Sequence, residues 1–564
     1  MGWLLSYIPE LPPIEMGYSR DASEAYKVIL LLAGLGLVAC WRMLPRWGAV
    51  SLLVVLTFTS AVNYTRLSEK LLFERMDTYD LIHYYLNTKY FDELGYFDLY
   101  PAIVRVDVDN GGPHFPGANM YRDQDETGHH EAPLSLALQK GELVRARFTP
   151  ERWSAFSHDF LHLQRKMKGL DRETWAQMLA DHGFNGTVAW MFVARPFTQI
   201  VPVESVKWLG YIDVVLLGTA VGFVAWAYGG SAALWTTFFL FTSYSTRWPT
   251  ISWAFFRYDY VSALVVAMCL LKKGKPFWAG FLTGYATTLR MFPAMWLYGP
   301  GMKGFIGLAG KKVHRAGLVL LAGFLVGLSV LQAAGTLEFG TGNVATHFEN
   351  MEDHNKSENI SSRRVGLALA LVYDFKLLPK IIDQPRKMVM ESQRHLRYAV
   401  AAACMVLLGW GLRKRPDHEA FAFGFLPFFL LTTASYYYYV TRMPLIAMHA
   451  GGLALMVPLA TGGSWKERAK RWFYGPGRHQ VGLAMLVGVE LFSTWAETVF
   501  PKYRWFLIGW MAWGIFAYTI VMALWYAVAS RQDGEPVEGV AQAVGTGGSE
   551  GGGGQSGGVQ PAAS

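Results

Sequence analysis

Two carboxylates lie close together in a tyrosine-rich segment that follows an apolar stretch. Residues 75–100 read RMDTYDLIHYYLNTKYFDELGYFDLY, and at helical spacing Asp77, Asp80 and Tyr84 share one face. Partial burial and like charge would raise the pKa of one carboxyl group, which suits a general base at neutral pH. The alternative is an interfacial aromatic helix with solvated acids, because tyrosine and tryptophan gather at membrane surfaces.

Basic side chains that could hold a phosphate group follow later in the chain. Arg290 stands in Thr288–Pro293, between two apolar stretches. A guanidinium at membrane depth usually faces a cavity, and its planar fork fits a phosphate. The alternative is an Arg290 side chain that only extends to the membrane surface. Arg257 and Asp259 could add phosphate or sugar contacts, or could pair with each other.

Three further groups could assist such chemistry. His347 could orient an acceptor or a donor phosphate, although it stands in a segment that could equally be a solvated loop. Arg363 and Arg364 could reach a phosphate. The tyrosine run 436–439 could stack on sugar rings or belong to an interfacial aromatic belt.

No metal site or cofactor is predicted. The Asp107-Val-Asp109 sequence matches a metal-binding pattern, but a match this short arises often by chance. The acidic and histidine residues of 123–131 could bind a divalent cation, so the sequence does not exclude such an ion. A solvated loop is the simpler interpretation of this segment. The three cysteines all stand in apolar runs, so neither disulfides nor a cysteine zinc site is expected.

The composition is that of a membrane protein. Hydrophobic residues make up 52% of the 564 residues and charged residues only 17%, whereas about 25% is usual in soluble proteins. This argues against a soluble enzyme, a disordered scaffold or a fibrous protein. We expect the lipid bilayer, and no nucleic acid, as a partner, because the net charge of +8 has a simpler source at the cytoplasmic ends of membrane helices.

Roughly 13 stretches have about the 20 apolar residues with which a helix crosses a bilayer. They are predicted at 26–44, 47–63, 208–228, 231–247, 257–272, 276–290, 291–309, 315–335, 396–412, 418–434, 441–460, 480–497 and 503–529. The resulting segments are 1–25, 26–63 with two spans, 64–207 as a large outer loop with an interfacial helix, 208–335 with spans, 336–395 as a second outer loop, 396–530 with spans, and 531–564 as a Gly-rich disordered cytoplasmic tail.

The orientation follows from basic residues between the spans. With these spans every basic cluster falls on one side of the membrane, which the positive-inside rule assigns to the cytoplasm. The clusters are Arg42/Arg46, Lys272/Lys273/Lys275, Lys311/Lys312/Arg315, Arg413/Lys414/Arg415 and Lys466/Arg468/Lys470/Arg471. Residues 64–207 and 336–395, which hold most of the candidate site residues, are therefore expected outside.

The order of a span, an aspartate, a tyrosine four residues on, a glycine and then Leu-Tyr resembles the GT-C class of membrane glycosyltransferases. It is most similar to the bacterial polyprenyl-phosphate-mannose-dependent mannosyltransferase family. The matching residues are Asp80, Tyr84, Gly95, Leu99 and Tyr100. The resemblance implies an all-α polytopic GT-C-like bundle with a large first outer loop, in the bacterial inner membrane.

The same resemblance implies a hexosyltransferase that moves a sugar from a polyprenyl-phosphate donor to a lipid, glycan or protein acceptor of the envelope. It implies Asp80 as first choice for the catalytic base and Asp77 as second. A basic residue before proline at a similar point of the span order resembles Arg290, which would stabilise the departing phosphate. With one base and no second nucleophile, we expect direct displacement with inversion.

Two other functions fit a chain with many spans. A lipid or solute transporter would often show internal repeats and charged groups at the membrane midplane. The sequence has no evident repeat, and its candidate charges gather at one membrane face. The other alternative is a non-catalytic envelope assembly protein whose long loop binds a partner. The enzyme hypothesis requires Asp80 and Arg290 to meet in one cavity at the outer face.

Overall fold

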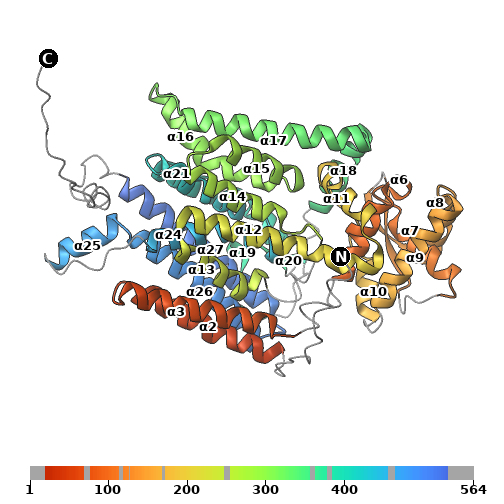
Figure 1. Ribbon diagram of the computed structural model, residues 1–564, viewed down its shortest axis with the longest axis horizontal. Helices are drawn as coiled ribbons and strands as arrows, with labels where there is room; N and C mark the ends of the chain where they lie inside the picture. The colour runs from red at the N-terminus through yellow and green to blue at the C-terminus, as the bar shows by residue number, and fades with distance from the viewer. Residues whose placement is uncertain are drawn as a thin grey trace, which may run out of the picture.

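A computed structural model describes residues 20–68, 77–112, 118–125, 128–167, 172–246, 255–355, 363–377, 384–454 and 464–530. Nearly all of its secondary structure is helical. Residues 1–19 of the predicted segment 1–25, and the predicted C-terminal tail 531–564, lie outside the described residues. The helices separate into a long bundle and a smaller lobe at one end of it, which residues 77–200 form (Figure 1).

The lobe follows the first two bundle helices in the sequence. These are α2 (Arg20–Cys40) and α3 (Arg46–Thr65). The lobe contains α4 (Thr78–Leu81), the π-helix η2 (Ile82–Leu86), α5 (Asn87–Lys89), α6 (Phe91–Leu94), α7 (Leu99–Asp109), β1 (Met120–Asp125), β2 (Gly128–Pro133), α8 (Leu134–Arg145), α9 (Pro150–Lys166), α10 (Arg172–Leu179) and α11 (Val188–Ile200).

The rest of the chain returns to the bundle. Its first part contains η3 (Val203–Gly210), α12 (Tyr211–Tyr228), α13 (Gly230–Thr242), η4 (Tyr244–Thr246), α14 (Asp259–Lys272), α15 (Pro276–Leu289), η5 (Phe292–Leu297), α16 (Tyr298–Ala309), α17 (Arg315–Phe339) and α18 (Thr341–Asn355). Its second part contains β3 (Arg364–Val365), α19 (Leu367–Val372), α20 (Gln384–Ser392), α21 (Arg394–Leu412), α22 (Asp417–Ala422), α23 (Phe425–Leu431), β4 (Ala434–Ser435), η7 (Tyr436–Arg442), α24 (Met443–Ala454), α25 (Trp465–Tyr474), α26 (Gly477–Val499) and α27 (Arg504–Ala529).

The chain is an all-α polytopic membrane protein, as its composition predicts. Within the described residues, six helices are long and apolar enough to cross a membrane. They are Asp21–Cys40, Arg46–Thr65, Val203–Tyr228, Arg315–Phe339, Arg394–Leu412 and Arg504–Ala529. The remaining predicted spans also coincide with helices, but several of these are shorter than a bilayer requires. One of them is broken in two, as α22 and α23, with Gly424 packed against Trp296 at the break.

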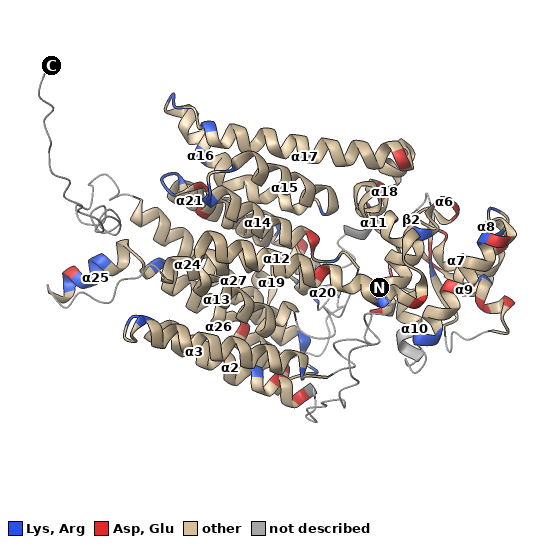
Figure 2. Ribbon diagram, in the orientation of Figure 1, with Lys and Arg blue, Asp and Glu red and all other residues tan. Residues whose placement is uncertain are grey.

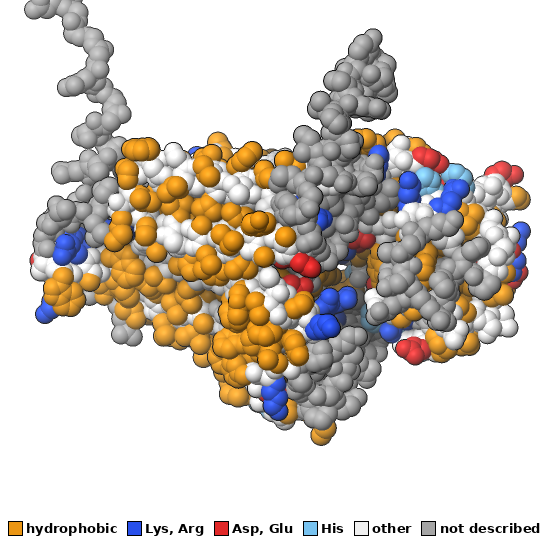
Figure 3. Space-filling model, turned by 90° about the horizontal axis from the view of Figure 1, so that it is seen from below, with side chains coloured by type: hydrophobic (Ala, Val, Ile, Leu, Met, Phe, Trp, Pro, Cys, Tyr) orange, Lys and Arg blue, Asp and Glu red, His pale blue; other side chains and the backbone are white. Residues whose placement is uncertain are grey.

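Charge is distributed unevenly along the bundle. Many lysines and arginines stand at the end that is far from the lobe, for example along α25, and others stand at the end beside the lobe (Figure 2). The middle of the bundle is almost free of charge. Apolar side chains cover much of the bundle face seen in Figure 3. Large apolar side chains are also exposed on individual bundle helices, for example Phe58 of α3 at 70% and Leu325 of α17 at 50%. Such a surface fits a lipid environment rather than water.

Close packing between α15 and α17 fixes the end of α15 nearest the lobe. Gly280 and Gly284 of α15 face Gly323 and Gly327 of α17, in a small-xxx-small pattern on both helices. A Cβ atom at Gly284 would lie 2.3 Å from the Phe324 carbonyl oxygen, and one at Gly327 would lie 2.2 Å from that of Phe281. Only glycine permits this approach, and α15 then ends directly before Arg290.

The lobe has its own apolar core. Trp153, Phe156 and Phe160, whose spacing predicts a helix, lie on α9 and are buried. Asp159 on the same helix accepts hydrogen bonds from Lys89 Nζ at 2.7 Å and from the Tyr90 hydroxyl at 2.9 Å. These contacts attach the segment of α4 to α6, which carries the candidate acids, to a rigid support.

Candidate active site

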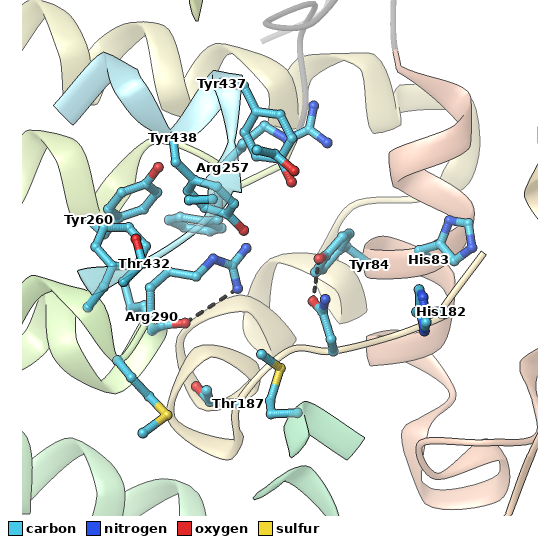
Figure 4. A pocket seen from close by; sticks show the side chains of 18 of the residues that line it. His83, Tyr84, His182, Thr187, Arg257, Tyr260, Arg290, Thr432, Tyr437 and Tyr438 are labelled. Carbon is cyan, nitrogen blue, oxygen red and sulfur yellow. Dashed lines mark hydrogen bonds between the residues drawn. The ribbon is translucent and has the colours of Figure 1, made fainter. Parts of the chain in front are cut away.

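A cavity of about 630 Å³ lies where the lobe meets the bundle. Its lining combines residues of the lobe, of the helix ends around α14 and α15, of α18 and of the segment that leads into η7. Five of the seven predicted site residues line it, namely Asp80, Tyr84, Arg257, Arg290 and His347. Figure 4 shows Arg257 and Arg290 on the bundle side, with Tyr84 and His83 across the open space from them.

Asp80 lies in the first turn of α4, where Asp77 caps the helix. The Asp77 carboxylate accepts a hydrogen bond from the Asp80 backbone N–H at 3.2 Å. The Asp80 side chain is only 4% exposed, and its Oδ1 accepts from Arg257 Nη2 at 2.7 Å. Burial raises the pKa of the Asp80 carboxyl group, and the charge of Arg257 opposes part of that rise. Asp80 thus has the environment of a tuned general base.

Asp77 does not line the cavity, but it belongs to the same charge cluster. Its Oδ2 lies 3.5 Å from Arg257 Nη1, so the Arg257 guanidinium faces both carboxylates. Asp77 therefore serves as a helix cap and as a second counter-ion. This geometry makes Asp80 the better candidate of the two for contact with a substrate.

Arg257 is positioned by a buried carboxylate of α12. Asp213 accepts backbone hydrogen bonds from Arg257 at 2.9 Å and from Tyr258 at 3.0 Å. The preceding residue, Phe256, has a φ of 49°, which is unusual for a residue with a side chain and turns the backbone sharply. This turn directs Arg257 toward the lobe, beside the ring of Tyr437 (Figure 4).

Arg290 follows α15 directly and has no acidic partner among the described residues. Its Nη1 donates to the neighbouring Leu289 carbonyl at 3.3 Å, and its buried Nε has no hydrogen-bond partner within the part of the chain that the structure describes. Tyr260 and Tyr438 lie near it (Figure 4). Asp80 and Asp259 interact with this guanidinium electrostatically, but no described carboxylate forms a direct ion pair with it, so its fork can take an anionic ligand.

Asp259 lies behind the cavity rather than in its lining. It begins α14, its Oδ1 accepts from the Tyr260 backbone N–H at 2.8 Å, and its Oδ2 accepts from the Tyr285 hydroxyl at 3.1 Å. Arg257 instead contacts Asp80 and Asp77. Asp259 is therefore placed to orient neighbouring groups rather than to touch a ligand.

Tyr84 and His347 approach the cavity from the lobe and from α18. The Tyr84 hydroxyl donates to Asn185 Oδ1 at 2.5 Å, and burial raises its pKa to about 12. His347 is 6% exposed, and its buried Nδ1 has no hydrogen-bond partner in the described part of the chain. Burial and the Arg290 charge lower the pKa of His347 to about 4, so its imidazole is neutral. A neutral imidazole can hydrogen-bond a substrate hydroxyl.

The structure adds a polar network that the sequence interpretation missed. The Tyr79 hydroxyl donates to Asp181 Oδ2 at 2.6 Å, and the two ring nitrogens of His83 contact the Tyr79 carbonyl and the Tyr100 hydroxyl, each at 2.8 Å. Tyr79, His83 and Asp181 all line the cavity. His83 stands three residues after Asp80 in the sequence, which was an available signal. The sequence gives no such signal for Asp181, because it follows α10 and stands about a hundred residues after Asp80 in the chain.

Arg364 is a third guanidinium in the lining. The short strands β3 and β4 pair antiparallel, with Arg364 opposite Ser435. This pairing joins Arg364 to the segment that continues into Tyr437 and Tyr438. The tyrosine run therefore belongs in part to the cavity and not only to a membrane-surface belt.

Several of the acidic and histidine residues predicted as a possible cation site at 123–131 have other partners. Asp123 is 2% exposed and lies 2.6 Å from Lys140 Nζ, and His129 Nδ1 lies 2.9 Å from His182 Nδ1. Asp107 accepts from Gln164 at 2.8 Å and Asp109 pairs with Arg145 at 3.2 Å. Across the described residues, no group of three or more His, Cys, Asp or Glu side chains could hold a metal ion.

No family model matches the chain, and no curated protein matches it. Among solved structures, the chain is similar to ArnT from Cupriavidus metallidurans, both bound to undecaprenyl phosphate and in the apo state. Each comparison gives 13% identity and a TM-score of 0.29. They cover 61% and 62% of this chain, and 68% of the ArnT chain. A likeness this distant assigns neither a family nor a substrate.

Proposed function

We propose that the chain is a membrane glycosyltransferase of GT-C type that moves a sugar from a polyprenyl-phosphate donor to an envelope acceptor on the outer face of the membrane. The observation that carries this proposal is that one buried carboxylate, Asp80, and one guanidinium without an acidic partner among the described residues, Arg290, line the same cavity. Sugar transfer from a phosphate needs these two functions, a base and a cation, near each other.

The donor phosphate is assigned to Arg290. The leaving group gains negative charge when the sugar–phosphate bond breaks, and a guanidinium in a poorly solvated site stabilises that charge strongly. Met291 also lines the cavity and is 62% exposed, so the cavity wall continues into an apolar outer surface. A polyprenyl chain could lie along that surface while its headgroup reaches Arg290.

Asp80 is assigned as the general base. An acceptor hydroxyl attacks the anomeric carbon of the donor sugar, its proton passes to the Asp80 carboxylate, and the bond between that carbon and the phosphate oxygen breaks. The electron pair leaves with the polyprenyl phosphate. One displacement of this kind inverts the configuration at the anomeric carbon. Arg257 holds the Asp80 carboxylate in place, and Tyr260, Tyr437 and Tyr438 offer faces for sugar rings.

The test compares Asp80→Asn with wild type in proteoliposomes that contain radiolabelled polyprenyl-phosphate hexoses and extracted envelope acceptors. We expect transfer of label out of the lipid donor to fall by about 10²- to 10⁴-fold, the usual contribution of a general base. Asp98→Asn is the control, because Asp98 is a lobe carboxylate that pairs with Arg147 at 2.6 Å and does not line the cavity. Full transfer by a folded protein with both Asp77→Asn and Asp80→Asn would overturn the mechanism.

A further inference from the structure

The two sides of the cavity differ in charge. The lobe wall consists of Tyr79, Asp80, His83, Asp181, His182 and Asn185. The bundle wall consists of Arg257, Tyr260, Arg290, Arg364, Tyr437 and Tyr438. Among the described lining residues, every guanidinium belongs to the bundle wall and both carboxylates belong to the lobe wall. Figure 4 shows the same division, with His83 and His182 across the cavity from Arg257 and Arg290.

The lobe wall is unfavourable for an anion. No described lysine or arginine lines it, and two carboxylates do. Burial raises the pKa of Asp181, but its interactions with His83, Tyr79 and the His182 backbone N–H outweigh that effect, so its pKa is lowered and the group is ionised. Burial in turn lowers the pKa of His83, which favours its neutral imidazole. Like charges brought together in a poorly solvated site cost several kcal/mol. The carboxylates of the lobe wall would repel a phosphate or a carboxylate group of the acceptor.

The lobe wall is also not a bare cation site. Asp181 Oδ2 accepts from the Tyr79 hydroxyl at 2.6 Å, and Oδ1 accepts from the His182 backbone N–H at 2.8 Å. The Asp80 carboxylate is held by Arg257 at 2.7 Å. Both charges are thus partly balanced before any ligand arrives. What the wall still offers is directional hydrogen bonding, through the remaining carboxylate lone pairs and the amide N–H groups of Asn185, whose Oδ1 is used by Tyr84.

We propose that the lobe wall is the acceptor subsite and that the acceptor's reacting unit is an uncharged sugar. This inference rests on the proposed function and names its second substrate by chemical class. The bundle wall then takes the anionic donor headgroup, and Asp80 stands where the two walls meet. Carboxylate, amide and phenol groups fixed in a network bind a neutral polyol, because its hydroxyls both donate and accept hydrogen bonds.

The direct test is the charge of the sugar unit that receives the label. Full-length protein in native membranes is supplied with radiolabelled polyprenyl-phosphate hexose, and the product is partially hydrolysed to its smallest labelled fragment above a monosaccharide. We expect this fragment to pass unretained through both an anion and a cation exchanger. Retention on either exchanger overturns the inference alone. Label that never leaves the polyprenyl lipid overturns the proposed function, and this inference with it.

Two variants separate the walls kinetically. For Asp181→Asn we expect the KM for the extracted acceptor to rise at least tenfold while the KM for the donor stays within twofold. For Arg290→Gln we expect the KM for the donor to rise at least tenfold while the KM for the acceptor stays within twofold. Both variants are compared only if their thermal unfolding midpoints match that of the wild type. If Asp181→Asn fails to fold, the acceptor KM is measured for Asn185→Ser instead, which removes the amide donors without changing a charge. An effect of Asp181→Asn or Asn185→Ser on the donor KM rather than on the acceptor KM would contradict the assignment of the walls.

Discussion

At the scale of single residues, Arg257 decides how basic Asp80 is. Burial raises the pKa of the Asp80 carboxyl group, and Arg257 is the largest of the influences that lower it. The two groups lie 2.7 Å apart, and the guanidinium also faces Asp77 at 3.5 Å. The same ion pair that orients the base therefore limits the rise in its pKa. Substitutions of Arg257 that keep or remove the positive charge separate these two effects.

The pH dependence of transfer should follow this pair. In Arg257→Gln the main influence that lowers the pKa of Asp80 is gone, so that pKa rises further. Because the base must be deprotonated, the acid limb of the kcat/KM profile moves to higher pH, by at least about one unit. Arg257→Lys keeps the cation and should leave the limb close to its wild-type position, although the loss of the fork lowers the rate. A limb that stays in place or moves to lower pH in Arg257→Gln would show that Asp80 is not the titrating base.

At the scale of elements, the glycine contacts between α15 and α17 position the phosphate-binding candidate. In Gly284→Ala the new methyl group meets the Phe324 carbonyl oxygen at 2.3 Å, so the helices must separate. We expect a loss of about 1–3 kcal/mol in unfolding free energy, the usual cost of overpacking, and a raised donor KM, because α15 ends at Arg290. Gly301→Ala on α16 is the matched control, since nothing lies within 4 Å of its added Cβ. Equal behaviour of the two variants would contradict this role.

The short helix η7, which carries the cavity tyrosines, is attached to α26 by a fully buried ion pair. Arg442 Nη2 lies 2.5 Å from Glu490 Oε1, with side-chain exposures of 0% and 1%, and Arg442 also donates to Ser245 at 3.0 Å. Arg442→Met leaves the buried Glu490 carboxylate without its counter-ion, although its Oε2 still accepts from the Tyr244 backbone N–H at 2.7 Å. The loss of the counter-ion should cost about 3–5 kcal/mol of stability. Adding Glu490→Leu should recover much of that loss. Thermal unfolding in detergent measures both, and equal instability of single and double variants would argue against a pairwise contact.

The sequence predicted the positions of the helices better than their lengths. Apolar stretches of suitable length located helices at every predicted span, because burial in lipid or protein needs a continuous apolar face. It placed α14 and α15 at the short stretches 257–272 and 276–290, close to their observed bounds. It did not predict that the chain breaks at Gly424 between α22 and α23, because that break comes with a tertiary contact to Trp296. The paired glycines of α15 and α17 were a readable signal that the span analysis passed over.

At the scale of the whole molecule, the site was predictable only where its residues stand in distinctive local patterns. Asp80 and Tyr84 share a helix face, and Arg290 interrupts an apolar run, so all three were predicted as site residues. Asp181 and Arg364 reach the cavity through tertiary contacts, one through Tyr79 and the other through the pairing of β3 with β4. No local pattern encodes such contacts. The division of the cavity into a basic bundle wall and an acidic lobe wall therefore required the fold.

The placement of the basic residues predicts which side of the membrane the lobe occupies. The basic clusters between the predicted spans, for example the one along α25, stand at the bundle end that is far from the lobe (Figure 2). The positive-inside rule therefore predicts that the lobe and the cavity lie outside. In a chain whose native cysteines are replaced, Glu151→Cys, at an exposed position in the first turn of α9, should react with a membrane-impermeant maleimide in spheroplasts. Lys312→Cys, an exposed position between α16 and α17, should react only in inside-out vesicles. The reverse pattern would place the cavity at the cytoplasmic leaflet, and a donor presented on the outer leaflet could then not reach Asp80 and Arg290.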